Sequence, residues 1–220
     1  MAIDPSNILL TGRVAVVTGG GEGIGRGIAE GLAAFGASVA IWERNADTCA
    51  SAAESTGALG IVTDVRDSEQ VDAALDRTAT ELANPSILVN NAGGVFHSPL
   101  LDTSENGWDA LYKSNLRHVL LCTQRVARRL VDAGQPGSVI NVTSIEGARV
   151  SPNGLSSSAG HMIPMGRPGH VDEMAGAAVF LASDMSSCLT GQTIHVDGGT
   201  QAASGWYHNP QSGDYQLGPS

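Results

Sequence analysis

The residues of this chain that could do chemistry begin with a glycine-rich stretch. Thr18-Gly-Gly-Gly-Glu-Gly-Ile-Gly25 comes directly after the β-branched run 14–17 and before an amphipathic stretch. Glycines at such a point allow a sharp turn and let a diphosphate approach the N-terminus of the next helix, where free N–H groups and the helix dipole favour an anion. The pattern predicts a nucleotide-diphosphate site, although a glycine cluster can also be only a tight turn.

A second candidate is Glu43, which ends the next apolar run 18 residues after Gly25. A carboxylate there can accept hydrogen bonds from both ribose hydroxyls of an adenosine, and its charge repels a 2′-phosphate. The residue therefore favours NAD over NADP as the cofactor. Two alternatives stay open: Arg44, next in sequence, could turn toward a phosphate, and Glu43 could be a solvated residue at a strand end.

The elements that must position these residues alternate along the chain. Short apolar runs predict strands, and amphipathic stretches between them predict helices. Strands are expected at 14–17, 38–42, 59–63, 87–90, 138–142 and 192–196. Helices are expected at 24–35, through 50, around 71–82, over 108–133 and over 171–183. This alternation predicts an α/β fold with a parallel sheet and right-handed crossovers.

The composition narrows the class of protein. The chain has 220 residues, of which 42% are hydrophobic and 15% charged, so disorder of the whole chain is excluded. Its net charge of -10 argues against nucleic acid or an anionic membrane as a partner. The three cysteines form no CxxC pair and no histidines have metal-ligand spacing, so we expect neither a disulfide framework nor a metal site. Without a secretory signal or a bilayer-length apolar run, we expect a cytoplasmic protein.

Further motifs follow the glycine stretch in a fixed order. They are Asp64-Val65, Asn90-Asn-Ala-Gly93, Asn115, Ser144, Ile163-Pro-Met-Gly-Arg167 and Asp197-Gly-Gly199. With these motifs, residues 12–200 resemble the short-chain dehydrogenase/reductase family. The resemblance implies a doubly wound, Rossmann-like parallel sheet in a single NAD-binding domain over residues 1–200, with 201–220 as a C-terminal tail.

The resemblance also implies roles for ten cofactor-binding positions: Gly19, Gly23, Ile24, Gly25, Glu43, Asp64, Val65, Asn91, Ala92 and Gly93. Gly19, Gly23 and Gly25 would line the diphosphate, and Ile24 would lie near the nicotinamide. The aspartate and its valine would meet the adenine, while the Asn-Ala-Gly run would border the adenosine ribose and steady the central strand.

Two further positions match the family's catalytic residues. Asn115 would hold a water in the proton relay, and Ser144 would hydrogen-bond the substrate oxygen. Without the resemblance, they could be an ordinary helix-surface amide and a turn serine. The implied activity interconverts a small secondary alcohol and a ketone, with a 3-oxoacyl or cyclic alcohol substrate as examples. The implied assembly is a homodimer or homotetramer that pairs the long helix.

One part of the family's pattern is missing. In this family a tyrosine transfers the proton, and a lysine four residues later lowers the pKa of that tyrosine. Residues 145–160, where the pair is expected, contain neither residue, and the only lysine of the chain is Lys113, next to Tyr112. The shortfall is roughly 40 residues, about one helix–strand unit after the fifth strand. We place the join near Asn153-Gly154.

Two explanations of the shortfall are open. The intact protein contains the unit and this sequence omits it, or the unit is deleted and the protein is a catalytically silent, NAD-binding or structural relative. The intact motifs on both sides favour omission. A true deletion must leave a sheet edge exposed or move the last strand beside the fifth.

Three smaller features have two interpretations each. The tail carries Trp206, Tyr207, Tyr215 and Leu217, and either docks on a neighbouring subunit near the substrate cleft or is a flexible end. His97 either borders the substrate or is a solvated loop residue. The long helix carries three arginines that form either a charged surface or a subunit contact: Arg125, Arg128 and Arg129.

Overall fold

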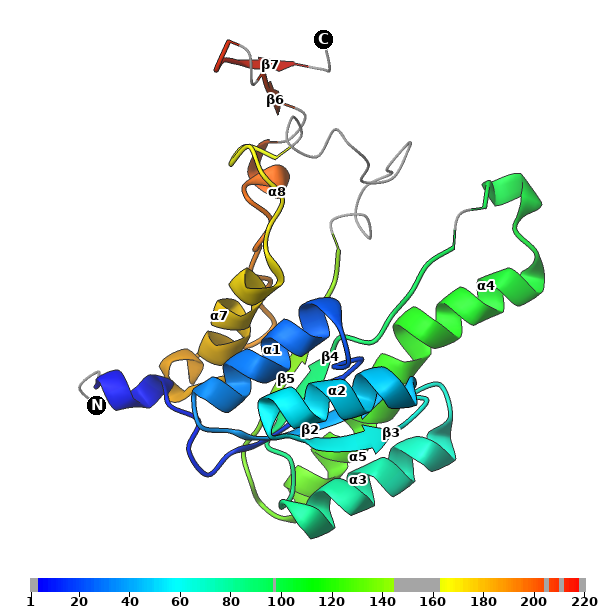
Figure 1. The fold of residues 1–220 in the computed structure, drawn as a ribbon, viewed down its shortest axis with the longest axis vertical. Helices are drawn as coiled ribbons and strands as arrows, with labels where there is room; N and C mark the ends of the chain where they lie inside the picture. The colour runs from blue at the N-terminus through cyan, green and yellow to red at the C-terminus, as the bar shows by residue number, and fades with distance from the viewer. Residues whose placement is uncertain (1–3, 97, 145–162, 204–205, 210–211, 218–220) are drawn as a thin grey trace.

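The centre of the molecule is a five-stranded parallel sheet. The computed structural model describes residues 4–96, 98–144, 163–203, 206–209 and 212–217. The sheet has the strand order β3-β2-β1-β4-β5, so the chain winds outward in both directions from β1 (Figure 1). Its strands are β1 (Val14–Thr18), β2 (Ser38–Glu43), β3 (Leu59–Val62), β4 (Ile87–Asn90) and β5 (Ser138–Asn141). The expected doubly wound α/β fold is confirmed.

Helices cover both faces of the sheet. The first face carries α1 (Gly23–Ala34), α2 (Ala46–Thr56) and α7 (Val171–Ala182). The second carries α3 (Ser68–Glu81) and α5 (His118–Asp132). The described chain also contains shorter helical elements: η1 (Pro5–Ile8), η2 (Leu100–Asp102), α4 (Glu105–Tyr112), η3 (Lys113–Arg117), η5 (Asp184–Ser186) and α8 (Thr200–Ala203).

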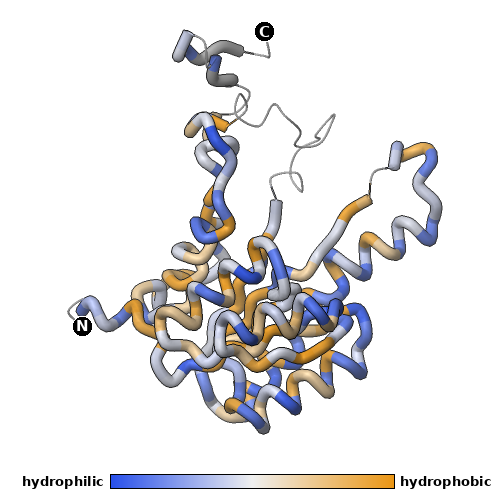
Figure 2. The backbone as a smooth tube through the Cα atoms, viewed as in Figure 1, coloured by the Kyte–Doolittle hydropathy of each residue, from blue (hydrophilic) through white to orange (hydrophobic). Residues whose placement is uncertain are grey.

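The core consists of two apolar layers, one on each face of the sheet. All five residues of β1 are buried, which is the reason that its first four residues form an apolar run rather than an alternation. Ile28 and Leu32 of α1 pack with Val179 of α7 on the first face, and Leu75 of α3 packs with Val126 of α5 on the second. Figure 2 shows the same division, with hydrophobic residues along the strands and hydrophilic ones on the outer sides of the helices.

The long helical stretch expected at 108–133 is divided in the structure. Between α4 and α5, the five residues of η3 form a π-helical turn. The buried stripe of α5 repeats every four residues, with His118, Cys122, Val126 and Leu130 against the sheet. Within the described residues, no helix is both long enough and apolar enough to cross a membrane.

The arginines of α5 hold it to the neighbouring helix. Arg125 forms a bidentate ion pair with Asp72 of α3, at 2.6 and 3.0 Å, and Arg129 pairs with Asp76 one turn further on. Arg128 is exposed. Two of the three arginines therefore make contacts within the chain.

The last expected strand is wrong: residues 192–196 are not a strand in the structure. They follow α7 and η5. Residues 192–195 are exposed, and Val196 is partly buried. A strand needs a partner whose N–H and C=O groups it can bind, and within the described residues β5 pairs with β4 alone. The apolar pattern of 192–196 would therefore predict a strand correctly only if the sheet continued beyond β5 and offered a partner.

The tail after residue 200 contains short elements of its own. After α8, β6 (Trp206–His208) and β7 (Tyr215–Leu217) pair as an antiparallel hairpin, separate from the main sheet. Figure 1 shows the hairpin beyond α8, away from the five-stranded sheet. Docking of the tail on a neighbouring subunit stays a prediction.

The buried imidazole of His118 makes stability depend on pH. The side chain is 1% exposed, and neither ring nitrogen has a hydrogen-bond partner within the described residues. Burial lowers the pKa of His118 below its usual value. Below about pH 6.5 the unfolded chain therefore takes up a proton that the folded chain resists, and stability falls as the pH falls.

We predict that His118→Leu removes part of this acid sensitivity. From pH 7.5 to 5.5 the native protein should lose up to about 1 kcal/mol of unfolding free energy through this residue, and the variant should not. Urea unfolding at both pH values measures the difference. His195→Gln, at an exposed position, is the matched control and should behave as the native chain does. Equal pH dependence in all three proteins would contradict the prediction.

Candidate functional site

The glycine turn between β1 and α1 is packed against itself and against the loop after β4. Gly19 has a φ of 63°, and a Cβ there would lie 2.9 Å from the Cα of Ala92. A Cβ on Gly25 would overlap the carbonyl oxygen of Gly19 and the side-chain amide of Asn91. Only glycine fits both positions, since the main chain itself occupies the space that a side chain needs.

The N-terminus of α1 has no side-chain cap. The side chain of its N-cap, Glu22, accepts no hydrogen bond from the helix, whereas the side chains of Asn45 and Asp67 cap α2 and α3. The first N–H groups of a helix have no partner inside it, so this end is able to bind an anion. Gly23 opens onto free space, with nothing within 4 Å of an added Cβ. The residues present therefore fit a diphosphate.

Glu43 lies beside this turn at the carboxyl end of β2. Its Oε2 accepts a long hydrogen bond from the N–H of Gly21, at 3.4 Å, and its Oε1 accepts one from the N–H of Asn45, at 2.9 Å. The side chain is half-buried, and Arg44 next to it is exposed. The carboxylate is thus held by main-chain donors next to the turn, as a ribose acceptor would have to be.

Asp64 and Val65 follow β3, the next strand outward. The Asp64 carboxylate forms an ion pair with Arg66, with Arg66 Nη2 at 2.5 Å from Oδ2. Hydrogen bonds from Arg66 lower the pKa of Asp64, so the carboxylate is ionised well below neutral pH. Val65 is buried in the apolar layer that also contains Trp42. Most of the Val65 side chain therefore packs in the core rather than facing outward.

The Asn-Ala-Gly run after β4 is joined to the end of β1. Asn91 Nδ2 donates to the carbonyl oxygens of Thr18 and Gly19, at 3.1 and 3.0 Å. The N–H groups of Asn91 and Ala92 both donate to Thr18 Oγ1. The Asn91 side chain thus holds the glycine turn in place. Thr18 was not among the expected site residues, and its signal in the sequence is a hydroxyl at the end of an otherwise apolar strand.

The side chain of Asn115 is hydrogen-bonded to the same loop, at Gly94. Its Nδ2 donates to the carbonyl oxygen of Gly94, at 2.9 Å, and its Oδ1 accepts from the N–H of Gly94, at 3.1 Å. It also donates to the carbonyl oxygen of Leu111 one turn earlier. Asn115 lies in the π-helical turn η3, and such turns are frequent at functional sites. The side chain is therefore bound to the loop that borders the candidate site.

Ser144 lies three residues beyond the end of β5 and is exposed. The parallel strands β4 and β5 end at the same side of the sheet, where Asn90 Nδ2 donates to Asn141 Oδ1 at 2.9 Å. Ser144 therefore follows the same carboxyl end of the sheet as the Asn-Ala-Gly run. His97, and the expected join near Asn153-Gly154, lie outside the described residues.

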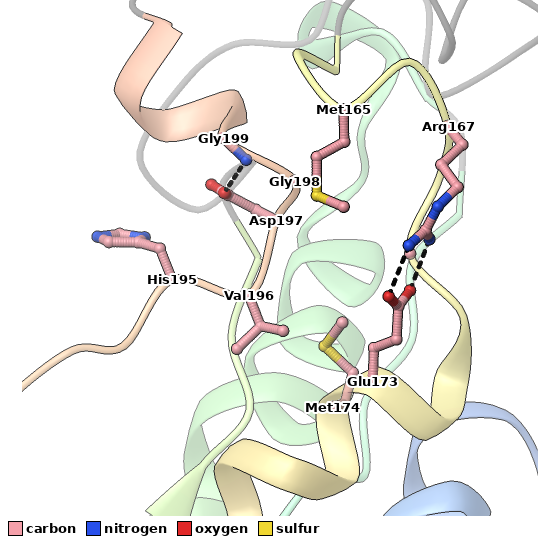
Figure 3. A pocket seen from close by; sticks show the side chains of 10 residues that line it. Met165, Arg167, Glu173, Met174, His195, Val196, Asp197, Gly198 and Gly199 are labelled. Carbon is pink, nitrogen blue, oxygen red and sulfur yellow. Dashed lines mark hydrogen bonds and ion pairs between the residues drawn. The ribbon is translucent and has the colours of Figure 1, made fainter.

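A separate hollow of about 430 Å³ lies between the start of α7 and residues 195–199 (Figure 3). Arg167 and Glu173 face each other across one side in a bidentate ion pair with both N–O distances at 2.8 Å, and this pair lowers the pKa of Glu173 to about 2. The Asp197 carboxylate accepts from the N–H of Gly199. The charged groups of the hollow are therefore already paired. Within the described residues no cluster of three or more metal-ligating side chains exists.

We predict that Gly25→Ala abolishes nucleotide binding or destabilises the protein by 1–3 kcal/mol, because the new methyl group overlaps the main chain of the turn. Gly176→Ala is the matched control: it lies in α7 with free space around an added Cβ, and alanine favours a helix. Calorimetry with NAD and thermal unfolding measure both effects. Native-like binding and stability in Gly25→Ala would contradict the packing described above.

The chain matches two family models. Residues 13–160 match the model described as short chain dehydrogenase, and residues 153–201 match one described as enoyl-(acyl carrier protein) reductase. The two matches overlap only at 153–160, the part of the sequence in which we place the join.

Several characterised proteins and solved structures are similar to this chain over nearly their whole length. The 3-oxoacyl-[acyl-carrier-protein] reductase of Chlamydia muridarum is 32% identical, over 88% of this chain and 99% of the relative. The gluconate 5-dehydrogenase of Gluconobacter oxydans is 32% identical, over 89% and 97%. A crystal structure of a gluconate 5-dehydrogenase from Burkholderia cenocepacia, in complex with NADP and tartrate, is 32% identical with a TM-score of 0.78, and covers 90% of this chain and 98% of its own.

These alignments also contain a gap in this chain. The alignment with the Chlamydia muridarum reductase has 246 positions, but 88% of 220 residues is only about 194. About 50 residues of that relative therefore have no counterpart here. The family model covers two thirds of the chain, and the parallel sheet, the glycine turn and the residues that hold it agree with that match. This chain belongs to the short-chain dehydrogenase family of oxidoreductases.

Proposed function

We propose that the protein binds NAD(H) in preference to NADP(H), and that it serves the interconversion of a secondary alcohol and a ketone by hydride transfer. The observation that supports this most directly is the uncapped glycine turn at the start of α1, with the Glu43 carboxylate beside it. Relatives named as dehydrogenases and reductases of hydroxylated or 3-oxoacyl compounds support the reaction class. The solved structures leave the choice between NAD and NADP open, because one holds NADP and another, under 25% identical to this chain, holds NADH.

The charges near Glu43 support the preference for NAD. A 2′-phosphate needs a free guanidinium or ammonium group, and Arg66 is already paired with Asp64. Arg44 is exposed, so a phosphate would have to attract it from solvent. Glu43 instead places a negative charge beside the turn. That charge favours the two neutral hydroxyls of the adenosine ribose of NAD over the 2′-phosphate of NADP.

The chain's own residues account for binding and orientation. Bound NAD supplies the hydride acceptor. The N-terminus of α1 would hold the diphosphate, Ile24, which is 39% exposed, would contact the nicotinamide side, and Asn115 would fix the loop after β4 through Gly94. Ser144 would hydrogen-bond the substrate oxygen and orient it.

The sequence contains no Tyr-x-x-x-Lys pair that could supply the proton at the substrate oxygen. Lys113, the only lysine, lies in η3 with its Nζ 4.0 Å from Asp109 Oδ2, and Tyr112 precedes it directly. A phenol needs a nearby cation to ionise at neutral pH. Because the expected Tyr-x-x-x-Lys pair is missing, a second function is supported: NAD binding without turnover, as a silent relative.

Self-association is part of the proposal. A stripe of exposed apolar side chains runs along α4, η3 and α5 at four-residue spacing: Trp108, Tyr112, Leu116 and Leu120. Isolated exposed apolar residues are normal, but a continuous stripe is typical of an interface. A homodimer or homotetramer that pairs this stripe would cover it.

We predict that calorimetry gives tighter binding of NAD than of NADP, and that Glu43→Gln narrows the difference several-fold. The variant keeps the size of the side chain and removes the charge that repels a 2′-phosphate. Glu54→Gln, on the exposed side of α2, changes the net charge equally and should keep the native preference. Tighter NADP binding by the native protein would overturn this choice of cofactor.

Intact mass and turnover decide between the two functions. A purified protein about 4–6 kDa above 22.5 kDa, with turnover of secondary alcohols, would mean that the intact protein contains the missing unit. For a protein of 22.5 kDa we expect NAD binding without turnover in a panel of alcohols and ketones. Turnover by the 22.5 kDa protein would contradict the silent function and require another proton donor.

A further inference from the structure

The loop between β3 and α3 lies beside Glu43 at the carboxyl end of the sheet. Val62, the last residue of β3, pairs with Glu43 in the register of the two strands. The N–H of Thr63 then donates to the carbonyl oxygen of Glu43 at 2.9 Å, and Asp64 follows directly. A base attached to a ribose at Glu43 would therefore lie near the Asp64 carboxylate. This placement rests on the proposed binding of NAD.

The Asp64 carboxylate is already bound to Arg66. Its Oδ1 accepts from the main-chain N–H and from Nε of Arg66, at 3.0 and 2.9 Å. Its Oδ2 accepts from Nε and Nη2 of the same residue, at 3.1 and 2.5 Å. An ionised carboxylate offers about four lone-pair sites, so these four contacts use its capacity to accept. The amino group of an adenine would have to compete with Arg66 for every one of them.

Other hydrogen bonds hold the loop in this conformation. The N–H of Asp64 donates to Gln70 Oε1 at 2.9 Å, and the carbonyl oxygen of Asp64 accepts from the N–H of Asp67 at 3.0 Å. Arg117, in η3, donates from Nη1 to the carbonyl oxygen of Arg66 at 2.7 Å. The main chain on both sides of the ion pair is thus fixed, on one side by α3 and on the other by η3. The guanidinium of Arg66 is therefore held where it covers Asp64.

An adenine amino group is a weak competitor for this carboxylate. The planar guanidinium of Arg66 matches both carboxylate oxygens, and the two side chains are only 39% and 25% exposed. In an exchange, a pair with two charged partners would give way to a hydrogen bond in which only the acceptor is charged. We therefore expect the ion pair to persist when a dinucleotide is bound.

We propose that Arg66 determines how the site recognises the base of the dinucleotide. By covering Asp64, it leaves the amino group of adenine without a carboxylate acceptor, so the site tolerates a base that lacks this group. Removing the guanidinium uncovers the carboxylate. Asp64 then accepts from the amino group, and the site becomes selective for adenine.

Calorimetry with two dinucleotides tests this proposal. One is NAD, and the other is its purine analogue, in which hydrogen replaces the amino group at C6 of adenine. Both have the same charge and the same ring nitrogens, so the ratio of their dissociation constants isolates the amino group. We expect a ratio below about threefold for the native protein and a preference for NAD of about tenfold or more in Arg66→Met, because a hydrogen bond to a charged acceptor is gained.

Two further variants show whether the effect belongs to this pair. Arg77→Met removes an exposed arginine that pairs with Glu81 on α3, so it changes the net charge equally and should keep the native ratio. Arg66→Met combined with Asp64→Asn should lose most of the gained preference, because the uncovered side chain is then a neutral amide instead of an ionised acceptor. Thermal unfolding shows whether each variant is folded.

Two results would overturn the proposal while leaving NAD binding intact. A strong preference of the native protein for NAD over the purine analogue would mean that adenine reaches an acceptor despite Arg66. An unchanged ratio in Arg66→Met would mean that uncovering Asp64 adds no acceptor. Should Arg66→Met not fold, Arg66→Gln replaces it with the same expected direction, and the ratio for the native protein is a test that needs no variant. A native protein that binds neither dinucleotide would instead overturn the proposed function.

Discussion

The close packing of the glycine turn against the loop after β4 is the constraint on which the site depends. Asn91 binds the carbonyl oxygens of Thr18 and Gly19, and Thr18 Oγ1 accepts from the next two N–H groups of that loop. These bonds join β1, the central strand of the sheet, to its neighbour β4. A diphosphate at the N-terminus of α1 would therefore bind to main-chain groups that are already fixed, at little further cost in conformational entropy.

The loop after β4 is held from two directions. Thr18 binds its first residues, and Asn115, in the π-helical turn, binds Gly94 a few residues later. An asparagine in a regular helix could face the same way, but the extra residue of a π turn changes the direction of every side chain after it. The turn lets α5 present His118 and Cys122 to the sheet while α4 continues away from it.

The missing helix–strand unit affects only one half of the molecule. The strands β1 to β4 carry the candidate nucleotide site, and the first apolar layer there is formed with residues of α7, which follows β5 in the chain. The helix α7 remains attached because it packs on α1 rather than on a sixth strand. Within the described residues, no strand pairs with the outer side of β5, and residues 192–196 form no strand. The proposed cofactor site and the missing Tyr-x-x-x-Lys pair therefore belong to different parts of the chain, since the first lies at β1 to β4 and the second is expected after β5.

Local sequence determined what depends on local physics. Runs of β-branched residues such as 14–17 predicted the strands, and the glycines of 18–25 predicted a turn that only main chain could line. Tertiary structure alone decided that Asn91 holds the turn, that Arg66 pairs with Asp64, and that residues 192–196 form no strand. The physical reason is that a hydrogen bond or a strand needs a partner. Whether residues 192–196 find one depends on the strand beside them, which their own sequence does not specify.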